Sequence, residues 1–310
     1  MENMYVFYEG KIVPENEVHI SVRCKGFNYG LGCFEGIRAY WDETEKQLYV
    51  FRMKEHYERL LQSCKTLYIN IPYTVEQLCE ATIDLLKKNN FQTTTYIRPV
   101  AFKGSNHVAP TLLDDDNRLV IYCQPMGNFV GKDELRAAFT SWERLGDNML
   151  PTRTKPTAAY LNSALASLEV VSKGYDEALF LTRNGHVCEG PGENVFMVRN
   201  GKLITPPPSD NILEGITRDT VMLLARQELG IEVIERSITR TELYAADEVF
   251  FSGTAMEVVA VVEVDDRKIG SGHQGTICRK LKELFFQVAT SKMKRYSDFC
   301  TPVYPMNKLS

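Results

Sequence analysis

Short runs of apolar residues predict several β-strands in the first 125 positions. The runs are rich in β-branched and aromatic side chains, which favour extended backbone. They are MYVFYEGKIVP (4–14), folded about its Glu-Gly pair, LYVFR (48–52), TTTYIRPVAF (93–102) and RLVIYCQP (118–125). This part of the chain is therefore expected to begin and end in strands.

Longer segments repeat their apolar side chains at the spacing of one helix face. Helices are predicted from Met53 onward and over residues 74–90, 160–173, 217–230 and 276–292. The second of these opens on a Thr-x-x-Gln capping box and ends in two lysines, which suit the negative end of a helix dipole. The third and fourth end at a glycine, which commonly terminates helices.

Strand signals return after residue 170. The runs EALFLTRNGHVCEG (177–190) and NVFMVRNGKLIT (194–205) each contain Asn-Gly, the pair that suits both central positions of a type I′ hairpin turn. DEVFFSGTAMEVVAVVEV (247–264) is interpreted as two apolar strands interrupted by Ser-Gly-Thr. Because a hairpin pairs its strands antiparallel, much of the second half is predicted to be antiparallel sheet.

The 310 residues suffice for about two domains of roughly 150 residues each. Two glycines and several charges interrupt the periodicity in MGNFVGKDELR (126–136), which marks a linker. We therefore expect a small N-terminal domain over residues 1–125, an interdomain loop over 126–136 and a larger C-terminal domain over 137–310. Helices and strands mix in both domains, so the predicted fold class is α+β/mixed.

Composition excludes several classes of function. Lys and Arg number 36 against 40 Asp and Glu, and a net charge of −4 provides no broad basic surface for nucleic acid. Neither a secretory signal nor a run of about 18 apolar residues is found, so we expect a cytoplasmic protein that does not span a membrane. The eight cysteines lack a C-x-x-C pair and are expected to be reduced. The five histidines form no metal-binding motif, and no metal is expected.

The glycine-rich stretch NYGLGCFEG (28–36) is the first candidate for chemistry. A dinucleotide-binding fingerprint, G-x-G-x-x-G, joins a strand to a helix. Here the last spacing is one residue too long, and the preceding residues make a poor core strand. A glycine-bordered loop that approaches a ligand closely is favoured instead, with a plain structural turn as the alternative. No P-loop motif is present.

Three further segments place small or acidic residues between elements. CEGPGEN (188–194) joins the two hairpins, and its proline and glycines favour a solvated loop. LEGITRD (213–219) leads into a helix whose first N–H groups either bind a phosphate or are simply capped. SGTA (252–255) is a turn able to present backbone N–H groups to an anion. Each signal is weak when taken alone.

Taken together, the segments resemble a known family. The order FNYGLGCFEGIRAY, FRMKEHYERL, YIRP, a lysine before YLNS, CEGPGEN, LEGITRD and DEVFFSGTAMEV is similar to class IV pyridoxal-phosphate aminotransferases, most closely the branched-chain amino acid aminotransferases. The resemblance covers the chain from about Tyr5 to Ile269. It implies a two-domain fold-type IV enzyme with a small N-terminal α/β domain and a larger C-terminal pseudo-barrel domain. It also implies pyridoxal 5′-phosphate (PLP) as cofactor and a homodimer or higher homo-oligomer.

The matching motifs imply roles around the cofactor. Lys155, in TRTKPTAAY, corresponds to the catalytic lysine that binds the cofactor and moves the substrate proton. Glu189 corresponds to the carboxylate that faces the pyridine nitrogen, and Tyr160 to the phenol that hydrogen-bonds O3′ of the cofactor. The other cofactor-binding positions match contacts to the phosphate: Arg59, Ile216, Thr217 and Thr254.

The resemblance also implies a substrate pocket, in which the SGTA turn receives the substrate carboxylate. The matching lining residues are Tyr29, Phe34, Gly36, Tyr96, Arg98, Met126, Phe129, Thr254 and Ala255. This chain departs from the family at Met126 and Phe129, where a phenol and an indole donor are often found. Pro156 likewise stands where glycines often follow the lysine. The cofactor set is thus intact, while the substrate set is altered.

The implied reaction moves the amino group of a branched-chain L-amino acid to 2-oxoglutarate, by a ping-pong mechanism through the PLP and pyridoxamine forms. D-amino acid or amine aminotransferases and aminodeoxychorismate lyases share the cofactor residues and are the alternatives, although YIRP and SGTAMEV favour the branched-chain type. An NAD-dependent dehydrogenase would give Lys155 no role. A non-catalytic binding protein would not need to retain the cofactor set. Small amino acids and 2-oxo acids are the expected partners, without nucleic acid or membrane.

Overall fold

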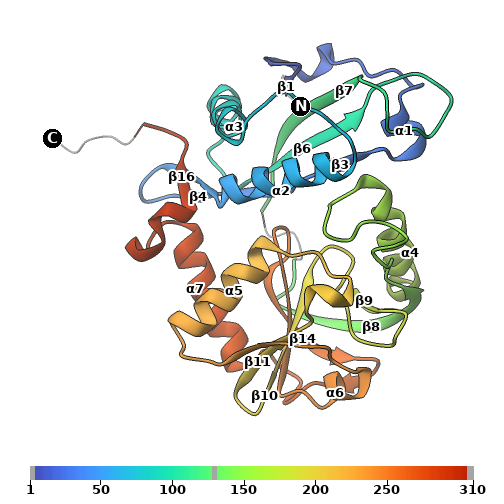
Figure 1. Ribbon diagram of the computed structural model, residues 1–310. Coiled ribbons are helices and arrows are strands. Elements are labelled where there is room, and N and C mark those ends of the chain that lie inside the picture. Colours follow the sequence, from blue (N-terminus) through green and yellow to red (C-terminus); the bar gives the residue numbers. More distant parts are fainter. Residues whose placement is uncertain (1–3, 128–130, 306–310) are drawn as a thin grey trace. The chain divides into compact units, whose positions relative to one another are not determined.

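The computed structural model describes residues 4–127 and 131–305, which fold as two units (Figure 1). The first unit comprises the chain up to Gly127, the segment Thr154–Ala158 and the residues from Gln287 on, and the second comprises the rest. The sequence pattern predicted domains continuous along the chain. The structure instead assigns two stretches of the predicted C-terminal domain to the first unit, because their hydrogen bonds are made there.

One antiparallel sheet forms the basis of the first unit, in the order β16-β5-β4-β6-β7-β1-β2, with β3 paired to β6. Its strands are β1 Tyr5–Tyr8, β2 Lys11–Pro14, β3 Gly32–Phe34, β4 Ile37–Asp42, β5 Gln47–Phe51, β6 Thr95–Lys103, β7 Asn117–Pro125 and β16 Cys300–Pro302. The runs predicted as strands correspond to β1, β2, β5, β6 and β7. The chain's last strand, β16, extends the sheet beside β5.

Two helices, α2 (Met53–Thr66) and α3 (Val75–Asn89), pack on each other and on this sheet (Figure 1). The predicted capping box of α3 is formed, because Thr74 Oγ1 accepts from the Gln77 N–H at 3.3 Å and Gln77 Oε1 accepts from the Thr74 N–H at 2.9 Å. Apolar side chains of both helices complete the core of the unit. The remaining helical segments of this unit are α1 Lys25–Tyr29 and the 3-10 turns Glu15–Glu17 and Lys294–Phe299.

A second sheet, ordered β12-β11-β10-β13-β14-β8-β9 with β15 paired to β14, forms the second unit. Its strands are β8 Glu134–Glu143, β9 Glu177–Leu181, β10 Asn194–Arg199, β11 Lys202–Thr205, β12 Val233–Glu235, β13 Glu248–Gly253, β14 Glu257–Val264 and β15 Arg267–Lys268. The pairs β8–β9, β8–β14 and β11–β12 are parallel. Strand β8 begins inside the predicted linker 126–136, whose residues 128–130 lie outside the described residues.

Single bridges continue this sheet beyond β9. Leu181 bridges Val187, and Glu189 in turn bridges Asn194, the first residue of β10. The Phe180 N–H also donates to the Glu189 carbonyl at 2.9 Å. The path from β10 through β13, β14, β8 and β9 thus returns to β10, which is the closure of a barrel.

The two Asn-Gly hairpins differ. Asn200 and Gly201 both have positive φ, +51° and +71°, as a type I′ turn requires. In the other hairpin only Gly185 is in the left-handed region, with φ of +78°, so the predicted type I′ turn there is wrong. The Thr182 N–H donates to the His186 carbonyl at 2.8 Å, which makes this a three-residue loop with glycine at its left-handed position.

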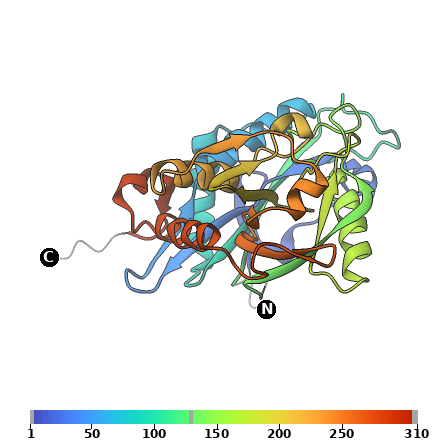
Figure 2. The ribbon, with the colours of Figure 1, turned by 90° about the horizontal axis from the view of Figure 1, so that it is seen from below.

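Four helices accompany the second sheet: α4 Tyr160–Val171, α5 Ile216–Gln227, α6 Arg240–Tyr244 and α7 Thr276–Ala289. The 3-10 turn Thr157–Ala159 begins in the first-unit segment Thr154–Ala158, and the 3-10 turn Pro208–Asp210 lies in the second unit. Helix α4 lies along β8 and β9 (Figures 1 and 2). Among the described residues no helix has the length and apolar character needed to cross a bilayer. All eight cysteines fall in the described part of the chain and are free thiols, as predicted.

Candidate active site

In the first unit, four of the predicted substrate-pocket residues lie together where β3 ends beside β6. Arg98 Nη2 donates to the Tyr96 hydroxyl at 2.7 Å, and its guanidinium carbon lies 4.2 Å from the centre of the Phe34 ring. Gly36 is required here, because a Cβ at this position would lie 2.3 Å from the Tyr96 hydroxyl oxygen. Phe34, Gly36, Tyr96 and Arg98 therefore form one cluster with a single fixed cation.

Lys155 adjoins this cluster. Its Nζ lies 5.2 Å from the centre of the Phe34 ring, and its carbonyl accepts from the Phe34 N–H at 3.1 Å. The Lys155 N–H donates to Ser63 Oγ at 3.3 Å, and the next residue, Pro156, bridges Cys33 in β3. Backbone contacts on both sides thus fix the position from which the amine extends.

Arg59 belongs to α2 in the same unit and contacts a carboxylate that sequence reasoning missed. Its Nε and Nη2 donate to the two oxygens of Glu35, at 2.7 and 2.8 Å. His56, one turn earlier on α2, lies with Nδ1 2.8 Å from Glu35 Oε2. The only signal for Glu35 was an acidic residue within the otherwise small and apolar run GCFEGI.

The ionisation of this group follows from its surroundings. Burial alone would raise the pKa of Glu35, but the Arg59 guanidinium and the hydrogen bonds from Arg59 and His56 outweigh it and hold the pKa well below its usual range. For His56 burial dominates, and its pKa lies below the usual value despite the neighbouring carboxylate. Glu35 and Arg59 therefore form a buried ion pair with a neutral histidine at neutral pH.

Three other predicted pocket residues lie apart from these contacts or outside the described chain. Tyr29, at the end of α1, has 38% of its side chain exposed. Met126 is half-buried just after β7, and the next carbonyl, of Gly127, accepts from Arg38 Nη2 at 2.7 Å. Phe129 lies outside the described residues.

In the second unit, Glu189 is the centre of a buried polar network. Its Oε1 lies 2.7 Å from Arg144 Nη2, and its Oε2 accepts from Asn194 Nδ2 at 3.1 Å and from the Leu213 N–H at 3.0 Å. Burial would lower the pKa of Arg144, but the Glu189 carboxylate raises it above its usual value. Arg144 was missed, because WERLGDN carries no signal that a buried partner lies 45 positions further along the chain.

The prediction of a solvated loop for CEGPGEN is wrong. Glu189, Glu193 and Asn194 are all at least 94% buried. The Gly190 N–H donates to the Glu193 carbonyl at 2.8 Å, and this tight turn folds into the gap between β9 and β10. Within it, burial raises the pKa of Glu193 well above its usual value, and the nearby Glu177 adds to the effect. A charged-looking loop is thus an interior part of the barrel.

Helix α5 begins at Ile216, after a backbone stretch that only glycine fits. A Cβ on Gly215 would lie 2.1 Å from Asn194 Oδ1. The N-cap residue, Gly215, has no side chain with which to cap this end of the helix, and Thr217 in the first turn is buried. Such an end presents backbone N–H groups and a partial positive charge, which together suit an anion.

The SGTA turn lies at the same end of the second sheet. Asn194 bridges Glu189 on one side and pairs with Ser252, two residues before Thr254, on the other. Gly253 packs against Glu193, because a Cβ there would lie 3.2 Å from Glu193 Cβ. Thr254 and Ala255 form the connection from β13 to β14.

Tyr160 is the first residue of α4 and interacts electrostatically with Arg144. The same helix is tied to the CEGPGEN segment by Ser163 Oγ, which donates to the Pro191 carbonyl at 2.7 Å. Of the predicted positions in the second unit, Tyr160 and Glu189 both interact with Arg144. Ile216 and Thr217 begin the helix whose N-cap Gly215 adjoins Asn194, and Thr254 and Ala255 follow β13, which pairs with β10. In the described part of the chain, no group of three or more His, Cys, Asp or Glu could hold a metal ion.

Comparisons with known proteins agree on one family. The family model described as "Amino-transferase class IV" matches residues 32–264. A probable branched-chain-amino-acid aminotransferase of Aquifex aeolicus is 48% identical over 301 residues, which is 97% of each chain.

Two crystal structures have closely similar folds. That of a branched-chain aminotransferase from Thermoproteus uzoniensis with norvaline has a TM-score of 0.93 at 43% identity, over 97% of this chain and 100% of that one. The PLP form of the branched-chain amino acid aminotransferase from Thermobaculum terrenum has a TM-score of 0.94 at 39% identity, over 98% and 100%.

Proposed function

This chain belongs to the class IV aminotransferases, and from that premise we propose that it is a PLP-dependent enzyme that transfers the amino group of a branched-chain L-amino acid to 2-oxoglutarate. The observation that carries the proposal is Glu189, a buried carboxylate that forms an ion pair with Arg144. A fixed buried anion of this kind suits a cofactor with a ring nitrogen that must stay protonated. When bound, PLP supplies an electron sink for the bond that breaks at the substrate Cα.

The charged groups of the two units fit such a cofactor. Glu189 is a carboxylate held by an arginine, an amide and a backbone N–H, and it could accept a hydrogen bond from a protonated ring nitrogen. In the second unit, the N-terminus of α5 at Ile216 and Thr217 is of a kind that suits a phosphate. In the first unit, Arg59 is a guanidinium of the type that binds phosphate bidentately. Tyr160 offers a phenol near Arg144.

Lys155 carries the covalent and proton-transfer chemistry in this proposal. Lys155 would hold the cofactor covalently through its amine, and the same amine, once free, would carry the proton from the substrate Cα to the cofactor. The contacts of its backbone with Phe34 and Ser63 fix the position from which this amine extends.

The Phe34–Gly36–Tyr96–Arg98 cluster is proposed to contact the substrate. It combines an aromatic face for an apolar side chain with one guanidinium that can hold a second carboxylate. This combination suits an enzyme whose donor is apolar and whose acceptor, 2-oxoglutarate, is acidic. The Thr254–Ala255 turn supplies backbone N–H groups for the carboxylate that both substrates share.

The visible spectrum tests the function directly. Purified enzyme with PLP is expected to be yellow and to lose this absorbance, in favour of the pyridoxamine form, when L-valine or L-glutamate is added. D-valine serves as the control and is expected to leave the spectrum unchanged. A protein that cannot be reconstituted with PLP, or that responds to the D-enantiomer alone, would contradict the proposal.

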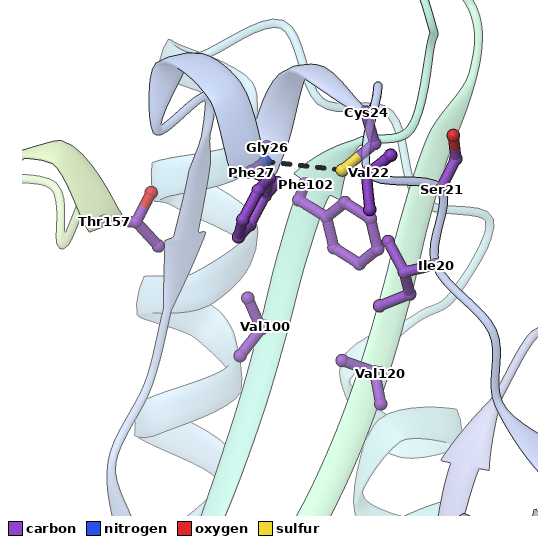
Figure 3. Close-up of a pocket in the computed structure, with 10 residues that line it drawn as sticks. All are labelled: Ile20, Ser21, Val22, Cys24, Gly26, Phe27, Val100, Phe102, Val120 and Thr157. Atoms are coloured by element: carbon purple, nitrogen blue, oxygen red, sulfur yellow. Dashed lines mark hydrogen bonds between the residues drawn. The ribbon is translucent and has the colours of Figure 1, made fainter. Parts of the chain in front are cut away.

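A homodimer is part of the proposal and is supported by an apolar surface of the first unit. Val22 and Phe27 leave 77% and 76% of their side chains exposed. They border a pocket of about 350 Å³, lined also by Ile20 and, on β6 and β7, by Val100 and Val120 (Figure 3). Exposed apolar side chains clustered in this way are typical of protein interfaces.

Charge placed on this surface is expected to separate the subunits. The double variant Val22→Glu/Phe27→Glu should sediment as a monomer at concentrations where the unaltered enzyme is a dimer, because burying two carboxylates opposes association. Tyr68→Glu, which alters an exposed aromatic residue elsewhere on the unit, should not change the sedimentation. If the double variant remains dimeric, this surface is not the interface.

A further inference from the structure

Among the described residues, the charged contacts of Glu35 are made with helix α2. Its side chain is completely buried, and its two oxygens receive Nε and Nη2 of Arg59 and Nδ1 of His56. Arg59 and His56 are three positions apart and therefore lie on one face of the helix. The Glu35 N–H donates to the Pro99 carbonyl at 3.0 Å, which ties this carboxylate to the sheet through β6.

Arg59 and Glu35 are joined by two hydrogen bonds. A guanidinium held through both Nε and Nη2 can neither rotate about its last bonds nor swing away from the carboxylate. An arginine side chain otherwise has several free torsions, whose ordering costs binding energy each time a ligand is captured. With Glu35 in place, that ordering is complete before any ligand arrives.

We propose that Glu35, supported by His56, is a positioning residue that fixes the Arg59 guanidinium for the phosphate of PLP. The inference rests on the proposed function, in which Arg59 binds that phosphate. Glu35 does not touch the phosphate, which it would repel. Its contribution is the orientation of the arginine that does.

A neutral residue in place of Glu35 changes the affinity of Arg59 for a phosphate through two opposing effects. Removing the carboxylate charge strengthens the Coulomb attraction of Arg59 for a phosphate, whereas removing the fork of hydrogen bonds lets the guanidinium move. In Glu35→Gln the amide NH₂ faces one of the Arg59 N–H groups, so the fork cannot form. The proposal requires orientation to dominate, and hence requires weaker phosphate binding.

Comparison of PLP with pyridoxal, which lacks the phosphate, isolates this effect. Glu35→Gln is expected to raise the dissociation constant for PLP about tenfold, the equivalent of one charge-assisted hydrogen bond, and to leave that for pyridoxal within about twofold. Both constants are measured by absorbance titration of the full-length protein after removal of its cofactor. His56→Gln, which keeps the Glu35–Arg59 fork, should give a smaller loss in the same direction.

Two companion variants make the outcomes distinct. Glu43→Gln, the same change on an exposed carboxylate paired with Lys46, should alter neither constant. Arg59→Met should weaken the binding of PLP and leave the binding of pyridoxal unchanged.

If Arg59→Met does so while Glu35→Gln leaves PLP binding unchanged or makes it tighter, the positioning role is wrong and the proposed function stands. Equal losses for both ligands in Glu35→Gln would reduce Glu35 to a folding role. If Arg59→Met leaves PLP binding unchanged, the phosphate role of Arg59 itself fails.

Discussion

Lys155→Ala is expected to bind PLP and yet lose transamination by at least about a thousandfold, within the range that a positioned acid–base group contributes. The variant keeps Glu189, Arg59 and the N-terminus of α5, so the cofactor retains its proposed non-covalent contacts. It loses the one amine that both binds the cofactor and moves the substrate proton. Steady-state rates with L-valine and 2-oxoglutarate, beside the PLP content of the purified variant, measure the two effects separately.

The control for this variant is an exposed lysine. Lys173 pairs with Glu169 on the surface of the second unit, and Lys173→Ala should keep full activity. Added methylamine should restore part of the lost rate in Lys155→Ala, because a free amine can serve as the missing base. Near-normal turnover by Lys155→Ala without added amine would refute the assignment of this lysine.

The apolar pattern predicted most elements, since strand and helix periods depend on local sequence. The pattern failed to predict one of the two hairpin turns, because the same dipeptide can adopt two turn geometries. Asn200-Gly201 and Asn184-Gly185 carry the same dipeptide, yet only the first forms a type I′ turn. In the second hairpin, Thr182 Oγ1 accepts from the His186 N–H at 3.2 Å and supports the longer loop. Side-chain contacts of this kind select between turns that the dipeptide alone leaves open.

The interior polar networks could not be predicted, because their partners are distant in sequence. CEGPGEN contains two glutamates, a proline and two glycines, a composition typical of solvated loops. Arg144, Asn194 and the Leu213 N–H make burial of Glu189 possible, and only the folded barrel brings them together. The family resemblance pointed to Glu189 directly, whereas it said nothing of Arg144 or Glu35.

The sequence pattern also could not predict which segments of the chain belong to each unit. Glycines and charges mark where periodicity ends, and this predicted a boundary at 126–136. Nothing in TRTKPTAAY indicates that Thr154–Ala158 packs with the first unit. The cause is a set of backbone contacts, from Lys155 to Phe34 and Ser63, which any sequence could make. The sequence pattern thus placed the segment that carries the proposed catalytic amine in the C-terminal domain, whereas the structure places it in the first unit.

The glycine-rich stretch NYGLGCFEG (28–36) has a structure that differs from a dinucleotide fingerprint. Its glycines suggested a dinucleotide fingerprint, which needs a strand before the glycines and a helix after them. The structure has the reverse, with α1 before Gly30 and β3 after it. Gly36 is small because Tyr96 occupies the space of a side chain, and no phosphate is needed to explain it. The interpretation as a glycine-bordered loop beside a ligand remains a prediction.

Glu189→Gln is expected to lower both activity and stability, and the two losses have different causes. Glutamine keeps the shape of the side chain but cannot keep a ring nitrogen protonated, so kcat should fall by about a hundredfold or more. It also leaves the Arg144 cation buried without a counter-charge, which should cost about 3 kcal/mol in the free energy of unfolding. Glu263→Gln breaks a solvent-screened pair with Arg136 in the same unit and should leave both the stability and the activity close to those of the unaltered enzyme.

The double variant Glu189→Gln/Arg144→Met separates the causes. With no buried cation left to compensate, it should recover most of the stability lost in Glu189→Gln, measured by urea unfolding of the cofactor-free protein. Its kcat should stay low, because the charge that faces the ring nitrogen is still missing. If activity returned together with stability, Glu189 would act only by holding the fold, and the carboxylate would have no electronic role in the reaction. A low kcat in a protein of restored stability is the result expected if the reaction uses the negative charge itself.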